Sequence, residues 1–128
     1  MNDLVREWVE KAEGDYRTAE RESIVTKDPN WDAVCFHAQQ AVEKYAKAVL
    51  QQEGLPVHKM HDLSSILKPL LRTHPDWEPA FASLERLSVF AVELRCPGEA
   101  ATQRDALEAV RIMREWRERL RSALEIDA

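Results

Sequence analysis

The sequence has few cysteines and glycines and no long apolar stretch, and each scarcity excludes a class of protein. Two cysteines, Cys35 and Cys96, cannot build a disulfide scaffold, and they lack the paired spacing typical of zinc sites. With three glycines among 128 residues, the chain contains no glycine-rich phosphate loop. The charged N-terminus argues against a signal peptide, and the short apolar runs fall far below the roughly 20 residues of a membrane span. We therefore expect a cytoplasmic protein with reduced thiols and no membrane association.

The composition is that of one soluble helical domain. Hydrophobic residues make up 45% and charged residues 32% of the chain, and alanine, leucine, glutamate and arginine dominate. A length of 128 residues predicts a single domain spanning residues 1–128. The net charge of −5 provides no overall basic field for nucleic acid. No motif for a cofactor is present, and we expect none to be bound.

Helical periodicity and capping residues predict five helices. We expect them over residues 3–22, 28–53, 62–73, 77–93 and 102–124. The expected caps are Asn2, Asp28 followed by Pro29, Asp62, and Thr102 with Asp105 three residues on; Gly54 should end the second helix, and Pro69 should kink or split the third. No segment alternates like a strand, so the predicted fold class is all-α, an antiparallel up-and-down bundle of four to five helices. Leu4 in the first helix and Leu107 in the last fall on the predicted inner stripes.

The second helix carries polar side chains along one border of its apolar face. His37, Gln40 and Lys44 fall within about 80° of one another at helical spacing, with Lys47 on the same side. Such a row predicts a groove that donates hydrogen bonds to a phosphate, a base or a partner's carbonyl groups. The alternative is that His37 lies at the border of the core without a ligand, and that the aliphatic parts of the lysine side chains cover apolar surface.

Arg95 follows the fourth helix and precedes a turn at Pro97 and Gly98. A guanidinium at this position suits a phosphate, which it contacts in a fork geometry. It suits equally well the last carbonyl groups of the helix, so the pattern leaves both roles open.

Two further patterns favour structural roles. His58 and His61, followed by Asp62, superficially resemble metal ligands, but they lie in an expected loop without further ligands, so we expect no metal site. The last helix contains six arginines interleaved with acids, and we expect most of these to pair within one solvated face.

Three motifs together resemble the HEPN domain family. They are the segment Phe36-His37-Ala38-Gln39-Gln40-Ala41-Val42-Glu43-Lys44-Tyr45-Ala46-Lys47-Ala48, the junction His61-Asp62-Leu63 and the turn Arg95-Cys96-Pro97-Gly98-Glu99. The resemblance extends over almost the whole chain and is most specific in the second helix. It implies a helical bundle that commonly dimerises. Small prokaryotic members are often encoded beside a minimal nucleotidyltransferase, in pairs resembling toxin–antitoxin modules.

The resemblance also implies ribonuclease activity in one large branch, which depends on an Arg-x(4–6)-His motif. Here no histidine follows Arg95, and the nearest other match, from Arg72 to His74, has one intervening residue. Cys96 occupies the position after the arginine where a tyrosine is expected. The tyrosine that some members present to the partner transferase is missing as well. Without the histidine, acid–base assistance to cleavage by the 2′-hydroxyl is lost.

We therefore predict a non-catalytic, homodimeric binding module for a nucleotide or a minimal nucleotidyltransferase partner. The expected interface uses the second or fourth helix. The expected ligand-binding residues are His37, Gln40, Lys44 and Arg95, which we expect to form one anion-facing site offset by an acid such as Glu43. The alternative is a metal-independent endoribonuclease with an altered site, in which Arg95 and His37 act on RNA. A purely structural dimer subunit is the third interpretation.

Overall fold

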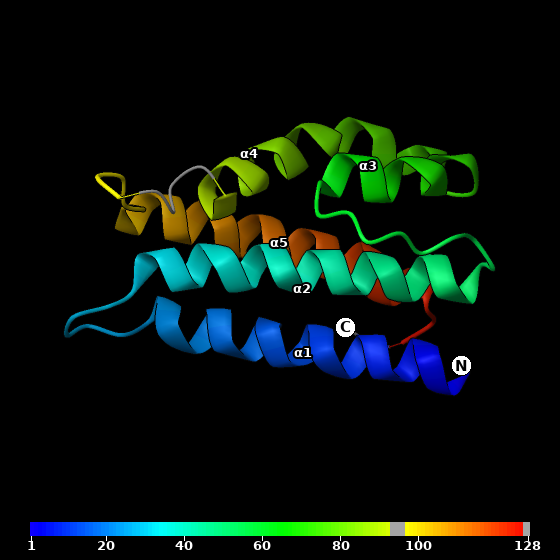
Figure 1. Ribbon diagram of the computed structural model, residues 1–128, viewed down its shortest axis with the longest axis horizontal. Helices are drawn as coiled ribbons and strands as arrows, with labels where there is room; N and C mark the ends of the chain where they lie inside the picture. The colour runs from blue at the N-terminus through cyan, green and yellow to red at the C-terminus, as the bar shows by residue number, and fades with distance from the viewer. Residues whose placement is uncertain (93–96, 127–128) are drawn as a thin grey trace.

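Four long helices run side by side in alternating directions in the computed structural model, which describes residues 1–92 and 97–126 (Figure 1). These residues contain five α-helices, two 3-10 helices and no strand, which confirms the predicted all-α class. The elements are α1 (Asp3–Ser23), α2 (Trp31–Gln52), α3 (Leu63–Leu67), η1 (Lys68–Arg72), η2 (Pro75–Ala80), α4 (Phe81–Val92) and α5 (Gln103–Ala123).

Most of the predicted caps are confirmed, with one correction. The side chain of Asn2 accepts a hydrogen bond from the backbone N–H of Val5 at 2.9 Å, and Thr102 and Asp105 form a reciprocal capping box on α5. The cap of α2 is Asn30 rather than Asp28, because Asp28 adopts a positive φ of 50° and lies in the connecting turn.

Proline residues shape the region between α2 and α4. The chain leaves α-helical geometry at Leu67 and continues as η1, because Pro69 has no N–H for an i→i−4 bond. The fourth helix was predicted from residue 77, but α4 begins at Phe81 because Pro79 keeps the preceding turn in 3-10 form.

The second helix is the centre of the bundle. No residue of α2 from 31 to 51 is fully exposed, since α1, α4 and α5 all pack against it (Figure 1). The core is completed by side chains of the other helices, of which Trp116 on α5 is the largest with no exposed surface. Its indole N–H donates to the Ser83 hydroxyl at 2.9 Å, so the buried donor is satisfied.

Two leucines that we predicted to be buried are exposed. Leu4 is 55% exposed and Leu107 is 52% exposed. In α1 the residue that enters the core is Val5, and in α5 it is Ala106, so each buried stripe lies one position before or after the predicted one. The shift leaves large apolar side chains on two separate surfaces.

The arginines of α5 were predicted to pair within their own helix, and only some do. Arg111 binds Glu108 and Glu115 on α5, as expected. Arg114 and Arg117 instead bind acids of α1, because both side chains point along the α1–α5 boundary. Among residues 1–92 and 97–126, no helix is long and apolar enough to cross a membrane.

Candidate functional site

The border between α1 and α2 brings two predicted site residues onto one acid. The Nδ1 atom of His37 lies 2.7 Å from one carboxylate oxygen of Asp15, and the Nζ atom of Lys44 lies 2.5 Å from the other. Seven residues separate His37 from Lys44, so both occupy the same edge of α2 two turns apart. Asp15 is only 11% exposed, and it therefore forms a shielded bridge between the two side chains.

This bridge changes the electrostatics predicted for the site. Glu43 was suggested as the offsetting acid, whereas the structure assigns that position to Asp15 of α1. Because an ionised carboxylate only accepts hydrogen bonds, Nδ1 of His37 carries the hydrogen. Its other nitrogen, Nε2, has no partner among residues 1–92 and 97–126, and the His37 side chain is 30% exposed. The sequence signal for Asp15 was an acid at a position within the apolar stripe of the first helix.

The third predicted residue on α2, Gln40, belongs to a different network. Its side-chain N–H donates to Oε1 of the Gln39 side chain at 2.9 Å rather than to Asp15. Gln39 in turn donates to Glu43 at 3.3 Å and to the backbone oxygen of His61 at 3.1 Å. Gln40 is thus connected to buried groups behind the His37–Lys44 edge.

Glu43 is the hub of that second network. Its carboxylate accepts from Lys47 at 3.1 Å and from Nδ1 of His61 at 3.2 Å, and both Glu43 and Lys47 are almost completely buried. The Nζ atom of Lys47 also lies 5.5 Å from the ring centroid of Trp8 on α1. The network therefore fixes the segment before α3, and the start of α1, to the middle of α2.

The fourth predicted residue, Arg95, lies outside the described residues. His37 and Lys44 face α1, whereas α4 packs on another side of α2 (Figure 1). The proposed convergence of Arg95 with these two side chains stays a prediction. The described residues contain no group of three His, Cys, Asp or Glu side chains that could hold a metal ion.

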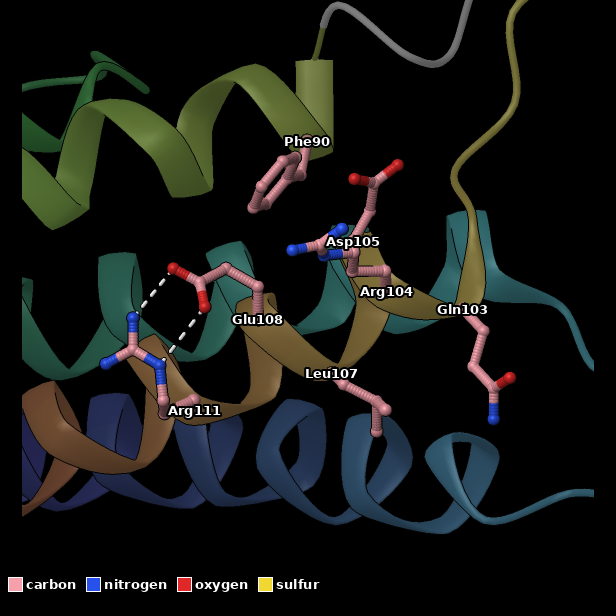
Figure 2. A pocket seen from close by; sticks show the side chains of 7 residues that line it. All are labelled: Phe90, Gln103, Arg104, Asp105, Leu107, Glu108 and Arg111. Carbon is pink, nitrogen blue, oxygen red and sulfur yellow. Dashed lines mark hydrogen bonds and ion pairs between the residues drawn. The ribbon is translucent and has the colours of Figure 1, made fainter.

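A groove of about 670 Å³ lies between α4 and the start of α5 (Figure 2). Phe90 reaches it from α4, and Figure 2 shows the ring directed toward α5, with the side chain of Arg104 extending below it. The remaining lining side chains come from α5 and are Gln103, Asp105, Leu107, Glu108 and Arg111. None of them was among the predicted site residues.

Most charges along this groove are paired. Arg111 donates to both carboxylate oxygens of Glu108, at 2.7 and 3.1 Å, and these hydrogen bonds hold the pKa of Glu108 below its usual value. Asp105 is engaged in the capping box of α5. Within the part of the chain that the structure describes, Arg104 has no ion-pair partner, so its guanidinium is available to a ligand or a partner.

The chain matches the model of the HEPN domain over residues 5–123. It belongs to the HEPN family. This confirms the resemblance carried by the motifs of α2 and of the two junctions. No curated protein and no solved structure matches the chain.

Within this HEPN domain, the near match to the ribonuclease motif that ends at His74 has a structural role. The Nε2 atom of His74 lies 2.7 Å from Glu53 at the end of α2, and its ring stacks on Trp77 with a centroid distance of 4.0 Å. His74 therefore joins α2 to η2 and is only 23% exposed. Of the four histidines, His37 is the one that combines an orienting acid, a partly exposed ring and a place in the most specific family motif.

Proposed function

We propose that this HEPN protein is a non-catalytic binding module whose partner is a second copy of itself. The two copies bind through the surface formed by α4 and the start of α5. The observation that carries the proposal is the groove in Figure 2, which combines exposed apolar side chains with paired charges. Leu107, which lines the groove from α5, is 52% exposed, and Val89, outside the lining but next to Phe90 on α4, is 37% exposed. Exposed large apolar side chains beside a groove are typical of an interaction surface.

The charges beside the groove favour a second copy as the occupant. Arg104, Glu108, Arg111 and Glu115 alternate in sign along the outer face of α5. If two copies cross in opposite directions about a two-fold axis, the acids of one α5 face the arginines of the other. Of the two helices predicted at an interface, α4 offers this exposed surface, while α2 is covered on several sides.

Binding to a minimal nucleotidyltransferase, as the family resemblance implies, is the alternative use of the same surface. The two possible partners predict different oligomeric states for the isolated protein. A second copy gives a dimer without any added component, whereas a transferase surface leaves the isolated chain monomeric.

A second candidate function is nucleotide binding at His37, Gln40, Lys44 and Arg95. The observation that favours it is the orientation of His37, because Asp15 holds Nδ1 and leaves Nε2 toward solvent, where it donates to a phosphate oxygen in the imidazolium form. The same Asp15 neutralises Lys44, so binding should be weak and should decrease with salt. Calorimetric titration with ATP and AMP, on the wild type and on Arg95→Ala, tests this candidate beside a melting curve of each form. If Arg95→Ala unfolds the protein and neither form binds, Arg95 is structural.

Light scattering of two matched leucine variants tests the docking surface. Leu107→Asp changes the groove, and Leu4→Asp changes a leucine of similar exposure on α1. We expect a mass near twice 14.8 kDa for the wild type and for Leu4→Asp, and a monomeric mass for Leu107→Asp. A monomeric wild type at micromolar concentration, or an equal loss of dimer in both variants, would contradict the proposed surface.

A further inference from the structure

A pocket of about 380 Å³ lies between η2 and the second half of α5. Two of its lining residues come from η2, and the other four share one face of α5 because they recur at helical spacing. The lining residues are Asp76, Trp77, Glu115, Glu118, Arg119 and Ser122. None of them lines the groove of Figure 2, and the volume is large enough for a small molecule.

The aromatic wall of this pocket is held in place by several elements. Trp77 is only 5% exposed, and its indole meets the ring of Trp116 edge-on at a centroid distance of 5.9 Å. His74 stacks on the same indole at 4.0 Å and is itself bound to Glu53 at the end of α2. The position of Trp77 is therefore fixed by contacts with α2 and α5 before any ligand binds.

The guanidinium of Arg119 lines the pocket without a hydrogen-bond partner. It lies 4.9 Å from the ring centroid of Trp116. None of its N–H groups donates to a residue of 1–92 or 97–126, and its Nη1 atom is buried without an acceptor. Glu115, four residues earlier, is engaged by Arg111 at 2.8 Å instead. Because buried donors in folded proteins are almost always satisfied, this guanidinium points to an acceptor supplied by a ligand, and a carboxylate fits it best.

Two acids of the pocket are unpaired as well. Asp76 of η2 and Glu118 of α5 form no hydrogen bond or ion pair with another described residue. Since Glu115 is paired with Arg111, the groups left for a ligand are two carboxylates and the guanidinium of Arg119. A phosphate or another pure anion would be repelled by both acids, and a pure cation would leave Arg119 without an acceptor. The charges match a ligand with one carboxylate and two amines.

We propose that this pocket binds a free basic α-amino acid of the lysine type. Its α-carboxylate accepts from Arg119, its two amines bind the carboxylates of Asp76 and Glu118, and its aliphatic chain lies against Trp77. A lysine at the C-terminus of a peptide lacks the free α-amine, and one at the N-terminus lacks the carboxylate. The free amino acid is therefore the form that matches all three charged groups.

NMR titration of the wild type, observed at the indole N–H groups of its four tryptophans, tests this proposal. We expect L-lysine to shift the signals of Trp77 and Trp116 saturably. The signals of Trp8 and Trp31 should stay unchanged, because neither residue lines the pocket.

Three analogues in the same titration each remove one charge of the ligand. L-Lysinamide lacks the carboxylate and should bind about tenfold more weakly, because it loses the hydrogen bonds from Arg119. L-Norleucine lacks the side-chain amine, and Nα-acetyl-L-lysine lacks the α-amine. We expect each to bind roughly threefold more weakly, since Asp76 and Glu118 are exposed and their ion pairs are worth less.

A matched pair of variants on α5 separates Arg119 from a general effect of charge. Arg119→Gln should weaken the binding of L-lysine about tenfold and abolish the preference over L-lysinamide. Arg104→Gln removes an arginine that is also without an ion-pair partner but lines the other groove, so it should bind L-lysine as the wild type does. Leu107→Asp should also bind normally, which distinguishes a failure of this site from a failure of the docking surface.

Four results would overturn the proposal. They are the absence of a saturable shift at Trp77 with millimolar L-lysine, equal shifts at Trp8 and Trp31, equal affinity of the wild type for L-lysine and L-lysinamide, and equal losses in Arg119→Gln and Arg104→Gln. The first three use the wild type alone, so they decide the matter even if Arg119→Gln does not fold.

Discussion

Asp15 on α1 accepts the Nδ1 hydrogen of His37 on α2 at 2.7 Å, and this contact decides which nitrogen of the imidazole faces solvent. The same carboxylate binds Lys44 at 2.5 Å, so a single acid from outside the α2 motif sets the charge of the whole edge. The family motif on α2 is therefore completed by a residue of another helix. The side chains of His37 and Lys44 are therefore paired with an acid and do not form an open basic site.

Replacing Asp15 by Asn should destabilise the protein because two hydrogen-bonded groups lose their charged acceptor. We expect the free energy of unfolding to fall by about 1.5–3 kcal/mol, the range for hydrogen bonds to charged groups. Denaturant unfolding measures the change. The control is Asp3→Asn, which removes a fully exposed acid from its pair with Arg6 and should leave stability nearly unchanged. Equal effects of the two substitutions would show that the Asp15 bridge contributes no more than a surface ion pair.

Two serines on α4 provide a second matched comparison. The Ser83 hydroxyl accepts from the buried Trp116 indole, so Ser83→Ala should leave that N–H unpaired and lower stability by about 1–2 kcal/mol. The Ser88 hydroxyl oxygen is buried without a hydrogen-bond partner in the described part of the chain. Ser88→Ala should therefore be neutral or stabilising. Thermal unfolding of both variants distinguishes the two, and a larger loss for Ser88→Ala would contradict the assignment.

The sequence predicted the helices well because their ends carry local chemistry. Asn2, Asp62 and Thr102 cap helices through their own side chains, so a few neighbouring residues suffice to identify them. The error at Asp28 arose because two potential caps lie within three residues, and backbone geometry chose Asn30. At Leu107, periodicity placed the inner stripe one residue away, since alanines at positions 106 and 109 allow a close approach that a hydropathy pattern does not reveal.

The site was less predictable because its geometry depends on contacts between helices. Spacing along α2 correctly placed His37 and Lys44 on one edge, since both belong to the same helix. The position of Asp15 within the apolar stripe of the first helix was unusual, but it did not indicate that this acid, 22 residues before His37, would lie between the two side chains. The groove beside Phe90 was missed for a related reason, because it requires the end of one helix and the start of another to be placed together.

Tyr45 should titrate far above an ordinary tyrosine. Burial, with a hydrogen bond to Glu13, raises its pKa to about 12, although a hydrogen bond from Arg121 opposes the shift. Since the folded pKa is raised above the unfolded value, Tyr45 stabilises the folded state below about pH 10, and this contribution is lost as the pH rises toward 12. Ultraviolet absorbance of tyrosinate measures the titration.

The chain has two tyrosines, so Tyr45→Phe isolates the absorbance change of Tyr16. We expect the substitution to remove the high-pH step and leave the rest of the curve. A Tyr45 step complete below about pH 11, while the protein is still folded, would show that the hydroxyl is not shielded as described.

The purified protein should not cleave RNA above background, because no histidine follows Arg95 and His74 is engaged with Glu53 and Trp77. His37 is the remaining candidate for acid–base chemistry, and its orientation by Asp15 makes it the residue to test. The assay compares the wild type with Arg95→Ala and His37→Ala on a structured and an unstructured RNA, and Asp3→Asn serves as a preparation control. Cleavage that persists in both active-site variants indicates a contaminating nuclease. Cleavage that is present in the wild type and in Asp3→Asn, but lost in Arg95→Ala and in His37→Ala, would establish an altered ribonuclease site and reverse the ranking of the two functions.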